Sequence, residues 1–88
     1  PGRDRSSGRH YMALIGEFRE VGSEKNGVHK PVTCGWRIFR IDGETILQLD
    51  TYGSNERQIP NKVSQSIQLD RESAERLLQI IRDTFPGI

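Results

Sequence analysis

The middle of the chain combines two aromatic rings, a guanidinium and an amide at alternating positions: Arg37, Phe39, Gln48 and Tyr52. Alternate residues of a β-strand point to the same face of a sheet, so these four side chains are expected to share one face. Aromatic rings on an open sheet face can stack against unpaired bases, and an arginine beside them can bind phosphate or stack as a cation. The pattern therefore predicts a platform for single-stranded nucleic acid. The same face could instead form a dimer interface or be covered by the N-terminal tail.

Cations in two long polar loops could flank this platform. The first loop, residues 22–31, carries Lys25 and Lys30, and the second, residues 54–64, carries Arg57 and Lys62. Phosphate contact requires only mobile positive charge at the edge of a groove, and loops supply it. Ordinary solvated loop charge is an equally good interpretation. The net charge of the chain is only +1, so a nucleic-acid partner must be inferred from where the charges lie.

Catalytic and metal-binding chemistry lacks candidates in this sequence. The two histidines fall in a predicted tail and a predicted loop, and the single cysteine, Cys34, has no obvious partner base. No carboxylate pair is held at a forced spacing, and no Cys, His and acidic residues have the spacing of a metal site. We expect no enzyme activity, no metal and no cofactor. Because one cysteine cannot form an internal disulfide, a reducing, cytoplasmic setting is the simpler interpretation.

A hairpin turn at Asp42 and Gly43 positions the platform residues. Asp-Gly between two alternating runs is a strong signal for a two-residue hairpin, and such a turn determines the pairing register. The pairs expected on the mixed polar and aromatic face are Arg37–Gln48, Phe39–Ile46 and Ile41–Glu44, and those on the opposite, apolar face are Trp36–Leu49, Ile38–Leu47 and Arg40–Thr45. Asp50 also falls on the mixed face, where its carboxylate would repel phosphate; it could instead pair with Arg37 or lie at the sheet edge.

Three further elements complete the predicted fold. Residues 11–21 are rich in strand-forming types and predict a strand bent at Gly16, and residues 64–69 predict a short last strand. Asp70 is a good helix N-cap, and apolar residues recur at helical spacing from 71 to 85, before Pro86 and Gly87. The order β-β-β-β-α predicts one α+β domain over residues 11–88, a four-stranded antiparallel meander with a C-terminal helix. Residues 1–10 predict a flexible basic tail.

One helix can cover only one face of the predicted sheet, and this bears on partners. The helix is expected on an apolar core of Trp36, Ile38, Leu47, Leu49, Ile67 and Leu69, which leaves Phe39, Ile41, Ile46 and Tyr52 partly open on the other face. The helix is apolar on more than one side, and such a helix usually packs on more than one surface. We therefore expect a homodimer with Leu78, Ile81 and Phe85 at the interface. No run of about 20 apolar residues is present, so no membrane partner is expected.

The sequence resembles the positive cofactor four family of single-stranded-DNA-binding transcriptional coactivators, including its bacterial branch. The residues that carry the resemblance are Gly35-Trp36-Arg37, Tyr52 at the end of the third strand, Pro60 and Lys62 in the polar loop, and Ser66-Ile67-Gln68-Leu69, where the family has Gly-Ile-x-Leu. The resemblance extends from Tyr11 to Phe85. It implies a homodimer built by antiparallel helix contact, in which paired curved sheets bind unpaired strands.

These observations lead to two expectations of function. The first is a dimeric module that binds single-stranded nucleic acid, most readily DNA, with little sequence specificity, in transcription or DNA maintenance. Such a protein would be cytoplasmic, and associated with the nucleoid in a bacterium. The alternative is a protein-interaction or dimerisation module that binds no nucleic acid and whose partners are other proteins.

Overall fold

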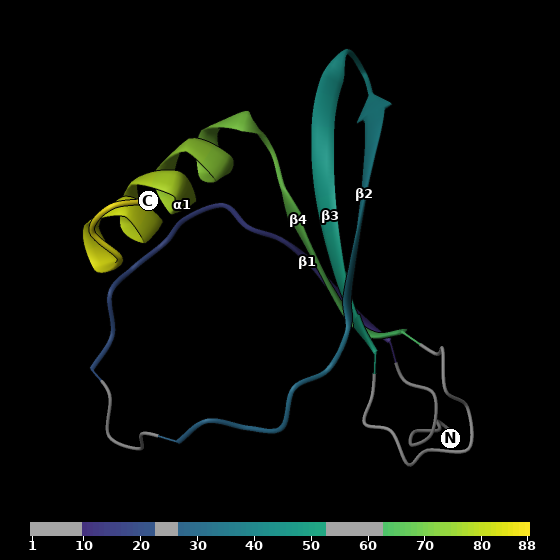
Figure 1. Ribbon diagram of the computed structural model, residues 1–88. Coiled ribbons are helices and arrows are strands. Elements are labelled where there is room, and N and C mark those ends of the chain that lie inside the picture. The colour runs from purple at the N-terminus through teal and green to yellow at the C-terminus, as the bar shows by residue number, and fades with distance from the viewer. Residues whose placement is uncertain (1–9, 23–26, 53–62) are drawn as a thin grey trace.

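A computed structural model describes residues 10–22, 27–52 and 63–88. These residues form a four-stranded sheet followed by one helix (Figure 1). The strands are β1 (Tyr11–Leu14), β2 (Cys34–Ile41), β3 (Glu44–Tyr52) and β4 (Val63–Leu69), and the helix is α1 (Arg71–Thr84). The α+β class and the order of elements along the chain agree with the prediction from sequence.

The β2–β3 hairpin has the register that its turn predicts. Asp42 and Gly43 both have positive φ angles, 52° and 81°, as a type I′ turn requires. Every cross-strand pair expected from the sequence is present, from Trp36 opposite Leu49 to Ile41 opposite Glu44. We call the side of the sheet with Arg37, Phe39, Gln48, Asp50, Ser66 and Gln68 the polar face, and the side with Trp36, Ile38, Leu47, Leu49, Ile67 and Leu69 the apolar face.

The strand order shows that the antiparallel meander was a wrong prediction. The order is β1-β4-β3-β2, and β1 pairs parallel with β4 instead of antiparallel with β2. The first strand also ends at Leu14 instead of residue 21, and just beyond it the Ile15 N–H donates to the Gln68 carbonyl at 3.0 Å. Strands that follow one another in sequence are usually neighbours in a sheet. Here β1 and β2 occupy opposite edges, so the connection between them passes from one edge to the other.

Helix α1 begins directly after β4 because Asp70 is its N-cap. The Asp70 carboxylate accepts a hydrogen bond from the Ser73 N–H at 3.0 Å, and Ser73 Oγ accepts one from the Asp70 N–H at 3.1 Å. This reciprocal capping box satisfies two backbone donors at the helix start. The hydrogen bonds from Ser73 lower the pKa of Asp70, so its carboxylate is charged at neutral pH.

The helix does not cover the apolar face of its own sheet, which corrects a second expectation. Figure 1 shows α1 leaving the end of β4 and extending to one side of the strands. Trp36 and Ile38, which were expected under the helix, are 67% and 60% exposed. A groove beside β4 is lined by Leu47 and Leu69 from the sheet and by Leu78 from α1. Because a single residue separates β4 from α1, the chain has no loop there that could turn the helix across β2.

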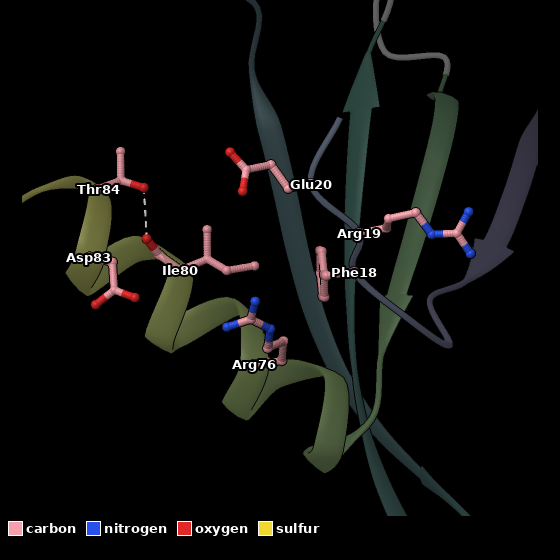
Figure 2. A pocket seen from close by; sticks show the side chains of 7 residues that line it. All are labelled: Phe18, Arg19, Glu20, Arg76, Ile80, Asp83 and Thr84. Atoms are coloured by element: carbon pink, nitrogen blue, oxygen red, sulfur yellow. Dashed lines mark hydrogen bonds between the residues drawn. The ribbon is translucent and has the colours of Figure 1, made fainter. Parts of the chain in front are cut away.

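The segment after β1 packs against another part of the helix. Phe18 is half-buried and lies across a hollow from Ile80 (Figure 2). The other residues that line this hollow are Arg19, Glu20, Arg76, Asp83 and Thr84. The helix residues that line this hollow are different from those that line the groove beside β4.

Burial within the described residues is concentrated on the polar face. Ile46 is 6% exposed, although it was expected to be partly open. Of the other residues in that expectation, Phe39 and Tyr52 are half-buried and Ile41 is exposed. Among the described strand residues, more side chains are therefore buried on the polar face than on the apolar face.

Candidate nucleic-acid interface

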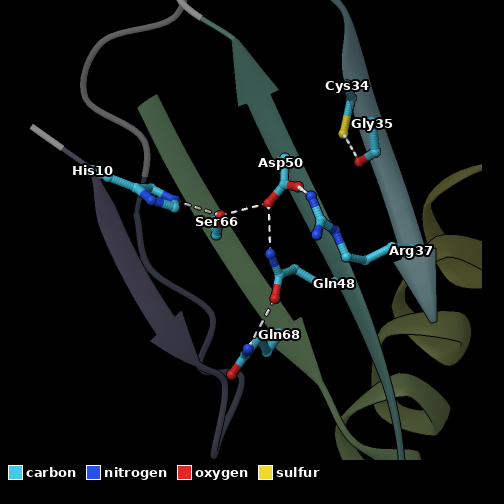
Figure 3. Close-up of polar contacts among 8 residues, drawn as sticks. All are labelled: His10, Cys34, Gly35, Arg37, Gln48, Asp50, Ser66 and Gln68. Atoms are coloured by element: carbon cyan, nitrogen blue, oxygen red, sulfur yellow. Dashed lines mark hydrogen bonds and ion pairs between the residues drawn. The ribbon is translucent and has the colours of Figure 1, made fainter. Parts of the chain in front are cut away.

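Asp50 is the centre of a hydrogen-bonded network on the polar face (Figure 3). One carboxylate oxygen accepts hydrogen bonds from Ser66 Oγ at 2.5 Å and from Gln48 Nε2 at 2.9 Å. The other oxygen accepts one from the Arg37 guanidinium at 3.0 Å. Gln68 Nε2 donates to Gln48 Oε1 at 2.9 Å. The Asp50 network, defined by these five residues, therefore crosses β2, β3 and β4.

The donors around Asp50 keep its carboxylate charged. The hydrogen bond from Ser66 is the largest cause that lowers the pKa of Asp50 below 3.8, followed by the bond from Gln48. Arg37 lowers it further through its hydrogen bond and charge, while burial acts in the opposite direction. Asp50 is 2% exposed, so its charge is directed toward these donors and does not face solvent. Of the two arrangements expected for Asp50, the structure shows the pairing with Arg37.

Arg37 is the exposed end of this network. Its side chain is 61% exposed, whereas the side chain of Asp50 is 3% exposed. Only Nη2 of the guanidinium is bound to Asp50, and Arg37 makes no other hydrogen bond or ion pair with the described residues. The remaining N–H groups can therefore donate to a phosphate or to a base. Asp50 holds the cation in place without using all of its donors.

Two aromatic side chains lie on either side of Arg37 along β2. Phe39 follows Arg37 on the same strand, and the Tyr52 ring lies over Gly35, which precedes it. A Cβ atom added at Gly35 would lie 2.9 Å from Tyr52 Oη, so a larger residue there would displace the ring. The predicted Arg37, Phe39 and Tyr52 are thus brought together on one face, with both rings half-buried.

Gln48 lies on the predicted face, but its side chain is buried instead of open to a ligand. It is 7% exposed, and its amide group is bound by Asp50 at one end and by Gln68 at the other. Gln48 therefore orients the Asp50 carboxylate and links two strands. A ligand on this face would meet Arg37 before it met Gln48.

Of the four predicted loop cations, the described residues include Lys30, which is not part of the Asp50 network. Lys30 is exposed in the segment that leads into β2, and it makes no hydrogen bond or ion pair with a described residue. Lys25, Arg57 and Lys62 lie outside the described residues. Of the residues predicted at a dimer interface, Leu78 and Phe85 are 45% and 57% exposed on or just after α1, and Ile81 is half-buried.

Sequence analysis missed Ser66, Gln68 and His10. His10 Nε2 lies 2.7 Å from Ser66 Oγ, and the single hydroxyl proton of Ser66 is donated to Asp50, so the histidine ring is the donor to Ser66. Alternation along a strand puts Ser66 and Gln68 on the same face of β4. Their register against β3 had no sequence signal, because the β3–β4 connection contains no turn motif comparable to Asp42-Gly43.

No metal site is formed within residues 10–22, 27–52 and 63–88, where no three His, Cys, Asp or Glu side chains come close enough to hold an ion. In the same residues, no helix is both long and apolar enough to cross a bilayer. Comparisons with protein-family models, with curated proteins and with solved structures find no match to this chain. The interpretation of the polar face therefore depends on its own geometry.

Proposed function

We propose that the protein binds single-stranded nucleic acid, most readily DNA, through the polar face of its sheet. The observation that carries this proposal is the exposed Arg37 guanidinium, bound at one nitrogen to buried Asp50 on the face that also carries Phe39 and Tyr52. A cation on the same face as two aromatic rings suits a chain in which phosphates and bases alternate. Contacts to phosphates and to the flat faces of bases carry little sequence information, so low sequence specificity is expected.

An unpaired strand fits this face better than a duplex does. Aromatic rings can stack on bases only where the bases are not already stacked within a double helix. Helix α1 packs beside Leu47 and Leu69 on the apolar side, so it is not placed to enter a major groove from the polar face. The resemblance to the positive cofactor four family supports the same proposal and suggests a role in transcription or DNA maintenance.

Fluorescence anisotropy with labelled single- and double-stranded oligonucleotides, across a salt series, tests the proposal. Arg37→Gln and Arg40→Gln are matched variants, because both arginines belong to β2 but lie on opposite faces of the sheet. Arg40 donates locally to Thr45 and to the Gly43 carbonyl. We expect single strands to bind more tightly, and Arg37→Gln to lower the slope of log affinity against log salt by about one. Arg40→Gln should change that slope little.

Two results would contradict the proposal. The first is that single strands do not bind at low salt. The second is that the two arginine variants lose affinity equally, because this would show general attraction to positive charge and no preference for the polar face.

A protein-interaction or dimerisation module is the second candidate, and the exposed apolar side chains favour it. Trp36, Ile38, Leu78 and Phe85 are all exposed, and large exposed apolar patches mark interaction surfaces. We also propose a homodimer, and nucleic-acid binding is compatible with it. A module that only self-associates would sediment as a dimer and show no affinity for either kind of oligonucleotide. A wild-type mass of one chain at micromolar concentration would count against the homodimer.

A further inference from the structure

The outer edge of β2 has no neighbouring strand among the described residues. β2 is the last strand of the sheet and is eight residues long, whereas β1 at the other edge has four. Natural edge strands are commonly short, or carry lysine, proline or a bulge that prevents further pairing. Between Cys34 and Ile41 there is no lysine, no proline and no register shift. This edge is therefore a template for another strand.

The two arginines of β2 do not place their charges at its outer edge, where they would oppose pairing with another strand. Arg37 donates to Asp50, and Arg40 donates to Thr45 Oγ1 and to the Gly43 carbonyl. Both guanidinium groups are thus drawn back toward β3. Trp36 and Ile38, by contrast, remain largely exposed at this edge.

Hairpin geometry determines which backbone groups point outward from β2. In a two-residue hairpin the residues that flank the turn form a hydrogen-bonded pair, and such pairs recur at every second residue. The Tyr52 N–H donates to the Thr33 carbonyl at 3.4 Å, in line with this spacing. The odd-numbered residues on the β2 side therefore direct their backbone groups toward β3. The outward N–H and C=O groups therefore belong to Cys34, Trp36, Ile38 and Arg40.

We propose that a second copy of this chain pairs antiparallel with the outer edge of β2, about a two-fold axis at Ile38. In this register Ile38 lies opposite Ile38 of the second copy. On the apolar face Trp36 lies opposite Arg40, and on the polar face Arg37 lies opposite Phe39. Each arginine of β2 therefore lies opposite an aromatic residue, and no two like charges are directly opposite each other across the interface. The order Trp-Arg-Ile-Phe-Arg is complementary to its own reverse, as a two-fold interface requires.

The neighbouring registers lack this complementarity. An axis at Arg37 would place the two Arg37 side chains directly opposite each other, and like charges in that position are destabilising. An axis at Phe39 would place Trp36 opposite Asp42 and remove both pairings of an arginine with a ring. The register at Ile38 also keeps the two polar faces on the same side. The dimer would therefore present two platforms side by side to one nucleic-acid strand.

Disulfide cross-linking in a Cys34→Ser background tests this register. Ile38→Cys would bring two thiols opposite each other, within the about 4–7 Å between Cα atoms that a disulfide requires. Ile41→Cys is the matched control, because Ile41 is also an exposed isoleucine of β2. In the proposed dimer its two copies would lie about 20 Å apart along the strands. We expect Ile38→Cys, and not Ile41→Cys, to form a covalent dimer under mild oxidation.

A charged variant tests the interface without a cross-link. Ile38→Lys should preserve the fold, because the Ile38 side chain is exposed and its backbone groups point away from β3. We expect an unchanged circular dichroism spectrum and a sedimentation mass that falls from two chains to one. The interface is wrong if the parent protein is monomeric at high micromolar concentration, or if both cysteine positions cross-link equally. It is also wrong if Ile38→Lys remains dimeric while Phe85→Glu does not, because the interface would then lie at the end of α1.

Discussion

The two faces of the sheet reverse the usual distribution of polarity. Gln48, Asp50 and Ser66 are buried on the polar face, while Trp36 and Ile38 are exposed on the apolar face. Large apolar side chains are ordinarily the buried ones, and buried charges are paired. Asp50 obeys the second rule. The exposure of Trp36 and Ile38 departs from the first rule, and it is the observation on which the proposed association depends.

The buried side chains of the polar face stabilise the sheet, whereas the exposed side chains of the apolar face are available to a partner. The Asp50 network links three strands, and its buried members Gln48, Asp50 and Ser66 would lose their hydrogen-bond partners without gaining water if it were broken, so its removal is costly. Trp36 and Ile38 contribute little burial within the chain. Changes to the buried side chains of the Asp50 network should therefore act on folding, and changes to Trp36 and Ile38 on association.

The largest expected effect contrasts one isoleucine on each face. Ile46→Ala should destabilise the fold by about 2–5 kcal/mol, because Ile46 is buried and its truncation leaves a cavity. Ile38→Ala should change the free energy of unfolding by no more than about 0.5 kcal/mol in a dilute, monomeric sample, because Ile38 is exposed. Urea unfolding of both variants measures this difference. Equal destabilisation would break the contrast between the faces.

The aromatic residues of the polar face should affect binding more than folding. Phe39→Leu and Tyr52→Leu keep apolar volume and remove the extended ring, so single-strand affinity should fall by about 1–3 kcal/mol for each stacked base lost. Anisotropy titrations measure the loss, and thermal unfolding checks that both variants remain folded. If both variants bind single strands with the affinity of the parent, the two rings are not part of the binding site.

Acid should lower the free energy of unfolding through protonation of Asp50. The folded-state pKa of Asp50 lies below the value of 3.8 for the free group, so the folded chain binds this proton less readily than the unfolded chain. Its stabilising contribution is therefore complete above about pH 4 and is lost as the pH falls through the folded-state pKa. In Asp50→Asn the free energy of unfolding should fall less steeply with acid than in the parent. Asp70, whose pKa is also lowered, is common to both proteins.

An identical acid dependence in the parent and in Asp50→Asn would show that the network contributes nothing through charge. Urea unfolding at a series of pH values, from neutral to about pH 2, makes the comparison. The network would then serve only to set the register of β4 against β3.

The smallest effect concerns Trp36, the single tryptophan of the chain. Trp36→Leu should change the stability of the dilute chain by no more than about 0.5 kcal/mol, because the ring is exposed. In the parent, the emission of Trp36 should be that of a solvated ring at low concentration and should shift to shorter wavelength as the chains associate. An oligonucleotide on the polar face should leave this emission unchanged. A blue-shifted emission at every concentration would place Trp36 in a core.

Local signals predicted the central part of the fold correctly. Asp42-Gly43 determines the β2–β3 register through its two positive φ angles, and Asp70 starts α1 through its capping bonds. Each of these features depends on residues close together in sequence. The hairpin also placed Arg37 and Asp50 on one face, which made their pairing one of the two arrangements expected for Asp50.

Long-range arrangements left no comparable signal. The parallel pairing of β1 with β4 joins Tyr11 to Gln65, and nothing in either segment specifies that partner. The direction of α1 depends on the single residue between β4 and the helix, which periodicity does not reveal. Ser66 entered the network because the β3–β4 register places it opposite Asp50, and that register follows no turn motif.

The position of β1 also has a consequence for the order in which the chain folds. The hairpin, β4 and α1 are consecutive along the chain and can assemble through nearby contacts, whereas β1 must close a long loop before it can pair with β4. β1 precedes β4 in the sequence and is therefore synthesised before its partner strand. Once β4 is made, one of its edges stays open until β1 docks. β1 is therefore placed in the sheet after strands that follow it in the sequence.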